Sequence, residues 1–117
     1  MSRGSTAFHN GMAAEDIAVR HYEAKGGKVQ ARRWKVREGE IDLIVLLEGV
    51  IVFVEVKARK TLETALHALQ PAQQVRLLAC AEQYLAKNAS LDSDCRFDLV
   101  AVDRNGAMEI LENVLAG

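Results

Sequence analysis

Two runs of apolar residues joined by a single turn constrain the fold of this chain most. The runs cover residues 40–47 and 50–58 and are rich in Val, Ile and Leu, which favour strands. Glu48-Gly49 lies between them and suits a two-residue turn, because glycine tolerates the positive φ that tight hairpin turns need. The sequence therefore predicts an antiparallel hairpin in which Leu47 faces Val50.

The two faces of this hairpin differ in character, because side chains alternate between faces along a strand. One face is apolar throughout and must be covered by another layer. It consists of Ile41, Leu43, Val45, Leu47, Val50, Val52, Val54, Val56 and Ala58. On the other face, at the end away from the turn, Asp42 lies opposite Glu55 and Glu40 lies opposite Lys57. Opposed residues have Cβ atoms about 4.5–5.5 Å apart, so the two carboxylates repel each other and some further interaction must offset this cost.

Helical and extended patterns flank the hairpin on both sides. Apolar residues recur at helical spacing before and after it, and Pro71 suits the first turn of the later helix. The predicted elements are helices over 7–25 and 71–88, strands over 28–36, 40–47, 50–58, 97–103 and 107–111, and a loop or weak helical turn over 59–70. This order predicts one α/β domain over residues 1–117, in which two helices cover a central sheet.

Composition excludes several classes of protein. Half of the 117 residues are apolar, which excludes a disordered chain, and no apolar run approaches the roughly 18 residues of a membrane helix. The first residues lack the apolar stretch of a signal peptide, and Cys80 and Cys95 have neither zinc nor CxxC spacing. We therefore expect a cytoplasmic protein with reduced cysteines and no membrane partner.

The residues that indicate a chemical function form one cluster, which consists of Asp42, Glu55 and Lys57. Mg²⁺ takes one or two carboxylates together with waters and substrate phosphate oxygens, so an ion between Asp42 and Glu55 would offset their repulsion. Lys57 shares a face with Glu55, where it could orient an attacking water or neutralise developing negative charge. The alternative is a structural ion cluster at a wet strand end, held by a Glu40–Lys57 salt bridge.

The same residues resemble a known motif. Asp42 followed by Glu55-Val56-Lys57 after an apolar strand resembles the pattern of the PD-(D/E)XK nuclease superfamily, although Ile41 stands where the motif's proline would be. The wider sequence resembles the YraN-type family, a widespread bacterial group of uncharacterised, endonuclease-like proteins. The segments that carry this resemblance are Ala14-Glu15, residues 39–44 (GEIDLI), 52–59 (VFVEVKAR) and 81–85 (AEQYL), and Arg96-Phe97-Asp98.

This resemblance implies a restriction-endonuclease-like sandwich in the order α-β-β-β-α-β, with a mixed sheet and helices on both faces, close to that of Holliday-junction resolvases. It implies an endonuclease that hydrolyses nucleic-acid phosphodiesters with Mg²⁺ or Mn²⁺, above all in branched or damaged DNA. Asp42 and Glu55 would be metal ligands, Glu15 of the first helix would complete the metal site, and Lys57 would be the catalytic lysine. A homodimer is compatible with it, since resolvase-like relatives act as pairs on two strands.

Further residues are assigned supporting roles. The family tends to carry a lysine at Gln73, so Gln73 or Gln74 offers only a neutral hydrogen bond, and we assign Gln74 to the site together with Glu40. The basic side chains that would contact nucleic acid are Arg32, Arg33, Arg59 and Lys60.

The net charge of −1, from 15 basic and 16 acidic residues, is low for a dedicated nucleic-acid binder. Acids gather in the proposed metal site, however, and basic residues over 32–37 and 57–60 flank the same hairpin. This distribution predicts local, metal-assisted contact with DNA. Two other functions stay open: a catalytically silent nucleic-acid-binding or accessory module, and an interaction protein in which the ionic cluster is structural.

Overall fold

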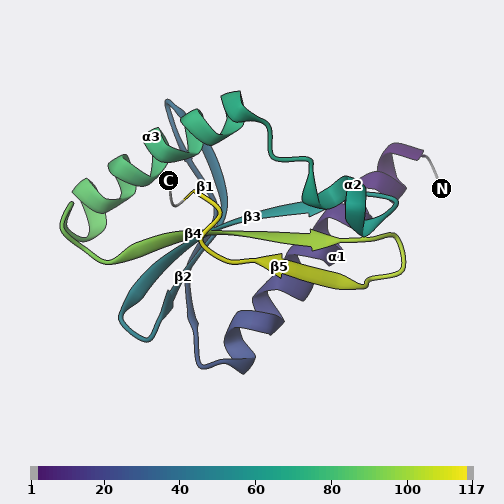
Figure 1. The fold of residues 1–117 in the computed structure, drawn as a ribbon, viewed down its shortest axis with the longest axis horizontal. Helices are drawn as coiled ribbons and strands as arrows, with labels where there is room; N and C mark the ends of the chain where they lie inside the picture. The colour runs from purple at the N-terminus through teal and green to yellow at the C-terminus, as the bar shows by residue number, and fades with distance from the viewer. Residues whose placement is uncertain (1–2, 116–117) are drawn as a thin grey trace.

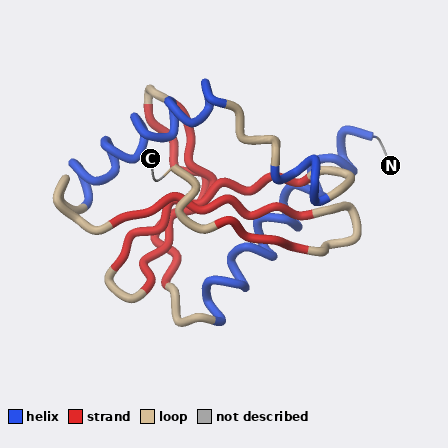
Figure 2. The backbone as a smooth tube through the Cα atoms, viewed as in Figure 1, coloured by secondary structure: helices blue, strands red, loops and turns tan. Residues whose placement is uncertain are grey.

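A computed structural model describes residues 3–115 of this chain, and their side chains from residue 12 onward. Five strands form one sheet, and helices lie on both of its faces (Figures 1 and 2). The elements are α1 (Arg3–Ala24), β1 (Lys28–Val36), β2 (Gly39–Leu47), β3 (Val50–Ala58), α2 (Leu62–Leu66), α3 (Pro71–Asn88), β4 (Cys95–Val102) and β5 (Met108–Leu111). The predicted α/β class is confirmed.

The sheet is mixed, with its strands in the order β1-β2-β3-β4-β5. Neighbouring strands run antiparallel except β3 and β4, which are parallel. A parallel pair needs a long crossover connection, and α2 and α3 supply it between β3 and β4. The crossover carries α3 over one face of the sheet, while α1 lies against the opposite face (Figure 1).

Two hydrophobic clusters hold these layers together. On one face, Ala14, Ala18 and Tyr22 of α1 pack against valines and leucines of β2, β3 and β4. On the other face, α3 packs against isoleucines of the hairpin and against Phe53, whose ring meets Tyr84 edge-on at 5.8 Å between centroids. The apolar hairpin is therefore covered on both sides, so polar groups that remain between the strands are held in a water-poor environment.

The predicted turn of the central hairpin is confirmed, and the predicted register is confirmed from the turn as far as Leu43–Val54. Glu48 and Gly49 both have positive φ, 51° and 79°, as a two-residue turn requires, and Leu47 pairs with Val50. The one misplaced hydrophobic residue is Ile41, which belongs to the cluster under α3 and not to the face that Leu43 shares with α1. The alternation of side chains between the two faces of the sheet is therefore interrupted at Asp42, which lies between Ile41 and Leu43.

Several predicted boundaries need correction. The first helix begins at Arg3 and not at residue 7, since no proline interrupts its start. The segment over 59–70 contains α2, whose first turn is capped by Thr61 Oγ1, which accepts the Thr64 N–H at 3.2 Å. Cys80 and Cys95 are both free, as expected. Within residues 3–115, no helix has the length and apolar character needed to cross a membrane.

Candidate functional site

The sheet divides at the residues that carry the acidic cluster. The backbone pairing of β2 with β3 extends from the turn to Leu43–Val54 and ends there. Beyond this point β2 stays paired with β1 as far as Gly39, and β3 stays paired with β4 as far as Ala58. The strands therefore form a fork, and the predicted Glu40–Lys57 pair across the hairpin is not part of the register. Glu40 pairs with Lys35 of β1 instead.

Asp42 and Glu55 occupy the fork and replace the missing backbone pairing. The Asp42 N–H donates to Glu55 Oε1 at 3.3 Å, and the Val56 N–H donates to Asp42 Oδ2 at 2.8 Å. These two reciprocal bonds hold both carboxylates at the divergence of the strands. The predicted proximity of Asp42 and Glu55 is thus confirmed, and it arises from side-chain bonds across the fork.

A cavity of about 310 Å³ opens at this fork. The residues around it are Gly39, Glu40, Asp42, Glu55, Val56, Lys57, Arg59, Gln73, Arg76 and Leu77. The cavity is therefore lined by both carboxylates, the predicted catalytic lysine and two arginines. Glu40 and Arg59 border it as predicted, whereas Arg76 of α3 is an addition that the hairpin pattern alone did not indicate.

Gln73 of α3 connects the lysine to the carboxylates. Lys57 Nζ donates to Gln73 Oε1 at 3.0 Å, and Gln73 Nε2 donates to Glu55 Oε2 at 3.4 Å. Gln74, the glutamine predicted to belong to the site, turns away and donates to the Leu69 carbonyl at 3.2 Å. One position along a helix rotates a side chain by roughly a quarter of a turn, so adjacent glutamines face different surroundings. The signal that could have identified Gln73 was its match to the family's lysine.

Burial dominates the electrostatics of the carboxylate pair. The Glu55 side chain is almost inaccessible, with 5% of its surface exposed. This burial, followed by the charge of Asp42, raises the pKa of Glu55 to about 8. Burial also raises the pKa of Asp42 above its ordinary value. The pair therefore retains a proton at neutral pH unless a cation compensates the second negative charge.

Glu15 of α1 lies near this pair but is bound by arginines. Arg33 donates from Nε at 3.2 Å and from Nη2 at 3.0 Å to the Glu15 carboxylate, and Arg32 Nη2 lies 3.5 Å from it. After burial, the charge of Glu15 also contributes to the raised pKa of Asp42. Among side chains 12–115, however, no three His, Cys, Asp or Glu residues are grouped to hold a metal. The structure therefore brings together Asp42 and Glu55, with Glu15 held to one side.

Arg33 also has an unusual backbone. Its φ is 51° in the middle of β1, at the position between the partners of Ile41 and Leu43. A non-glycine residue rarely adopts this conformation, and such strain often accompanies functional sites. Both strands are thus distorted at the level of Asp42, which directs the Arg33 guanidinium towards Glu15.

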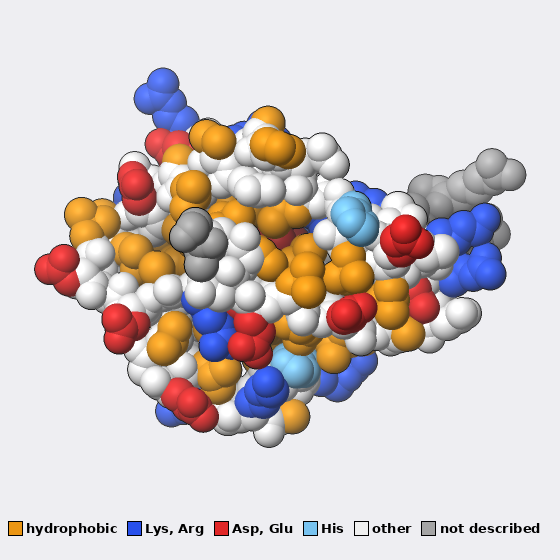
Figure 3. Space-filling model, viewed as in Figure 1, with side chains coloured by type: hydrophobic (Ala, Val, Ile, Leu, Met, Phe, Trp, Pro, Cys, Tyr) orange, Lys and Arg blue, Asp and Glu red, His pale blue; other side chains and the backbone are white. Residues whose placement is uncertain are grey.

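The remaining predicted basic residues differ in their surroundings. Arg59 borders the cavity and donates from Nη1 to the Ala58 carbonyl at 2.8 Å, and Lys60 is exposed just beyond it. Arg32 bridges to Asp16 at 3.0 Å as well as to Glu15. In Figure 3, acidic and basic side chains are interspersed on the visible face, in keeping with the net charge of −1.

Comparison with known proteins identifies the family. The model of the uncharacterised protein family UPF0102 matches residues 14–102, which include both strands of the fork. A UPF0102 protein of Roseobacter denitrificans is 42% identical over 114 residues, covering 97% of this chain and 88% of the relative. Those of Ruegeria pomeroyi and Rhodopseudomonas palustris are 41% and 40% identical, covering 96% and 86% of this chain and 92% and 78% of the relatives. The chain therefore belongs to the uncharacterised protein family UPF0102.

Proposed function

We propose that this protein is a metal-dependent nuclease that hydrolyses nucleic-acid phosphodiesters, above all in branched or damaged DNA. The observation that carries the proposal is the fork, where the buried Glu55, the partly buried Asp42 and Lys57 meet at one cavity. The mixed sheet, with one carboxylate on β2 and the second on β3, supports the restriction-endonuclease-like form of the α/β fold.

The donor set of the fork suits Mg²⁺ or Mn²⁺. Asp42 and Glu55 offer the carboxylate oxygens that hard cations prefer, and Mg²⁺ completes its shell with waters and phosphate oxygens. Burial and the charge of Asp42 raise the pKa of Glu55, and burial raises the pKa of Asp42, so a divalent cation would favour the ionised form of both carboxyl groups. Held by Asp42 and Glu55, such an ion would polarise a phosphoryl oxygen and lower the pKa of a bound water.

The chain's own residues would do the rest of the work. Lys57 lines the cavity, where its ammonium group can orient a water or stabilise negative charge on the phosphoryl group. Gln73 holds Lys57 in this position and simultaneously contacts Glu55. Arg59 and Arg76 border the same cavity and can bind phosphate oxygens of the substrate backbone.

The second candidate is a nucleic-acid-binding module without turnover. The contact between Arg33 and Glu15 favours it, because an arginine-bound Glu15 leaves two carboxylates and not three for the metal. This candidate predicts salt-sensitive DNA binding without metal-dependent cleavage.

The decisive experiment compares Asp42→Asn with the unaltered chain on labelled flap, junction and single-stranded DNA in Mg²⁺ or Mn²⁺. Asparagine keeps an oxygen that can accept the Val56 N–H, so the fork should persist while one metal ligand loses its charge. We expect cleavage to fall at least about a hundredfold, together with Mn²⁺ affinity measured by calorimetry. Asp92→Asn, at an exposed loop position, is the matched control and should cleave normally. Full cleavage by Asp42→Asn, or none by the unaltered chain, would refute the proposal.

A second prediction separates the two adjacent glutamines. Gln73→Ala removes the acceptor that positions Lys57, so we expect kcat to fall about tenfold while KM changes little. Gln74→Ala removes only a bond to the Leu69 carbonyl and should leave kcat close to that of the unaltered chain. Steady-state cleavage kinetics measure both, and equal losses in the two variants would contradict the role given to Gln73.

A further inference from the structure

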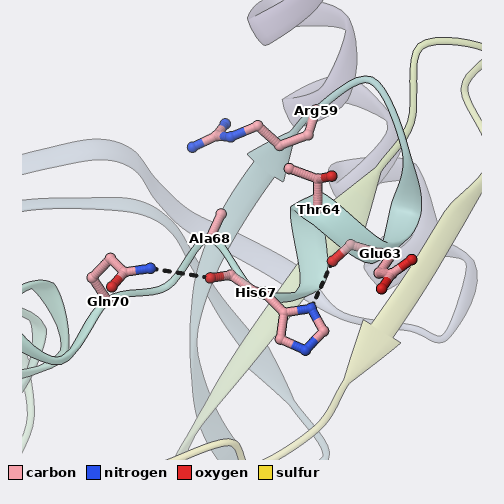
Figure 4. Close-up of a pocket in the computed structure, with 6 residues that line it drawn as sticks. All are labelled: Arg59, Glu63, Thr64, His67, Ala68 and Gln70. Atoms are coloured by element: carbon pink, nitrogen blue, oxygen red, sulfur yellow. Dashed lines mark hydrogen bonds between the residues drawn. The ribbon is translucent and has the colours of Figure 1, made fainter.

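A second hollow, here called the α2 pocket, lies next to the cavity of the fork. Its volume is about 560 Å³, and its walls are Arg59, Glu63, Thr64, His67, Ala68 and Gln70 (Figure 4). Arg59 borders both spaces, so a ligand that extends from one to the other passes this residue. The pocket is also built by the chain that continues directly from β3, which carries Glu55 and Lys57.

The α2 pocket presents one flat ring in a held position. The His67 Nδ1 lies 2.8 Å from the Glu63 carbonyl, which anchors one edge of the imidazole (Figure 4). The Gln70 Nε2 donates to the His67 carbonyl at 3.2 Å, so the backbone of this residue is held as well. His67 is nevertheless exposed, and its ring is accessible to a ligand in the pocket.

The charges around the α2 pocket are separated. In Figure 4 the Arg59 guanidinium and the Glu63 carboxylate extend in different directions, and of these two residues only Arg59 also borders the cavity of the fork. Arg59 is therefore placed to bind an anion where the two spaces meet. The pocket thus combines a cation at its junction with the fork, a methyl group, a flat ring and a side-chain amide.

This combination matches the parts of one nucleotide. Arginine binds phosphate oxygens, and an aromatic plane accepts an unstacked base by its π-face regardless of sequence. We propose that the α2 pocket receives one unpaired nucleotide next to the scissile phosphodiester, with its base against His67 and its phosphate at Arg59. This inference rests on the proposed nuclease function and names its substrate class: strands with an unpaired nucleotide at the cut, such as flaps and single strands. A base within a continuous duplex would first have to be unstacked and flipped out.

Binding without metal tests the pocket separately from catalysis. The full chain, labelled with ¹⁵N and kept in chelator, is titrated with the single-stranded trinucleotide d(TTT) and followed by NMR. We expect shifts of the Thr64, His67 and Ala68 amides. His67→Ala should weaken binding at least about fivefold, whereas His67→Phe keeps a flat ring and should retain it. Arg59→Ala should lower the salt slope of binding by about one, while Lys87→Ala, at the far end of α3, should leave it unchanged.

The outcomes distinguish this inference from the proposed function. If the amides of the α2 pocket stay unshifted while residues of the fork respond, the pocket proposal is wrong and the nuclease proposal stands. If the amides of the α2 pocket shift but no DNA is cleaved in Mg²⁺ or Mn²⁺, the pocket proposal stands and the nuclease proposal fails. Equal weakening by His67→Ala and His67→Phe would overturn the stacking role, and equal binding of a blunt duplex would overturn the preference for an unpaired nucleotide.

Discussion

Glu55→Gln is expected to stabilise the protein at high pH and to remove its affinity for divalent metal. The pKa of Glu55 is about 8 in the folded protein, against an ordinary value of 4.5. Between these values the folded state keeps a proton that the unfolded chain has lost, so the free energy of unfolding falls as pH rises. A neutral amide at this position avoids that loss. We expect Glu55→Gln to be more stable on the order of 2 kcal/mol at about pH 9, and nearly unchanged near pH 4.

Urea unfolding at the two pH values measures this difference, because the midpoint reports the stability at constant slope. Glu109→Gln, an exposed position on β5, is the matched control and should show no pH-dependent gain. If Glu55→Gln were less stable than the unaltered chain at high pH, the expectation would be wrong, because the folded protein would then stabilise the ionised carboxylate of Glu55.

The same variant reports on the metal. A ligand that binds only the folded state raises its stability in proportion to the logarithm of ligand concentration over Kd. Mn²⁺ should therefore stabilise the unaltered chain and leave Glu55→Gln unaffected. Because the ligand must be deprotonated, Mn²⁺ affinity should rise as pH increases towards 8. Mn²⁺ stabilisation of both proteins to the same extent would place the metal elsewhere.

Asp98→Ala is expected to cause the largest loss of stability, about 3–5 kcal/mol. Asp98 lies on β4 with 1% of its surface exposed and accepts hydrogen bonds from three directions. Its donors are the Tyr22 hydroxyl of α1 at 2.7 Å, Arg96 Nε at 3.1 Å and the Asn113 N–H at 3.1 Å. Alanine would leave a buried hydroxyl and a guanidinium without their acceptor, which costs the desolvation of both.

Urea unfolding of Asp98→Ala beside Tyr22→Phe tests this network. Tyr22→Phe removes only one donor and should cost about 1 kcal/mol. A loss for Asp98→Ala no greater than that for Tyr22→Phe would contradict the expectation. Because Tyr22 and Glu15 lie on the same helix, the network also fixes α1 against the sheet beside the fork.

Local pattern was sufficient for most of the regular structure. The bounds of β1, β3 and α3 agree with those expected from alternation, β-branched content and Pro71. The turn at Glu48-Gly49 follows from residue types that accept positive φ. Covalent neighbours and apolar periodicity determine these features, so a single sequence contains the information. The match of Asp42, Glu55 and Lys57 to a family motif likewise needs only their order along the chain.

Other features depend on contacts between distant segments. The predicted register continues past Asp42 and Glu55. In the structure, β2 stays paired with β1 and β3 stays paired with β4 beyond Leu43–Val54, so β2 and β3 separate and form the fork. Gln73 enters the site only because the crossover lays α3 over the same face of the sheet.

The sequence by itself therefore determined the central hairpin, its turn, the flanking elements and the candidate residues Asp42, Glu55 and Lys57. The tertiary structure alone decided that Glu15 is bound by Arg33, that Gln73 and not Gln74 reaches Lys57, and that a pocket adjoins Arg59. The physical reason is that strand formation and turns arise from neighbouring residues. The orientation of a polar side chain is decided by which partners the packed layers bring within hydrogen-bond distance.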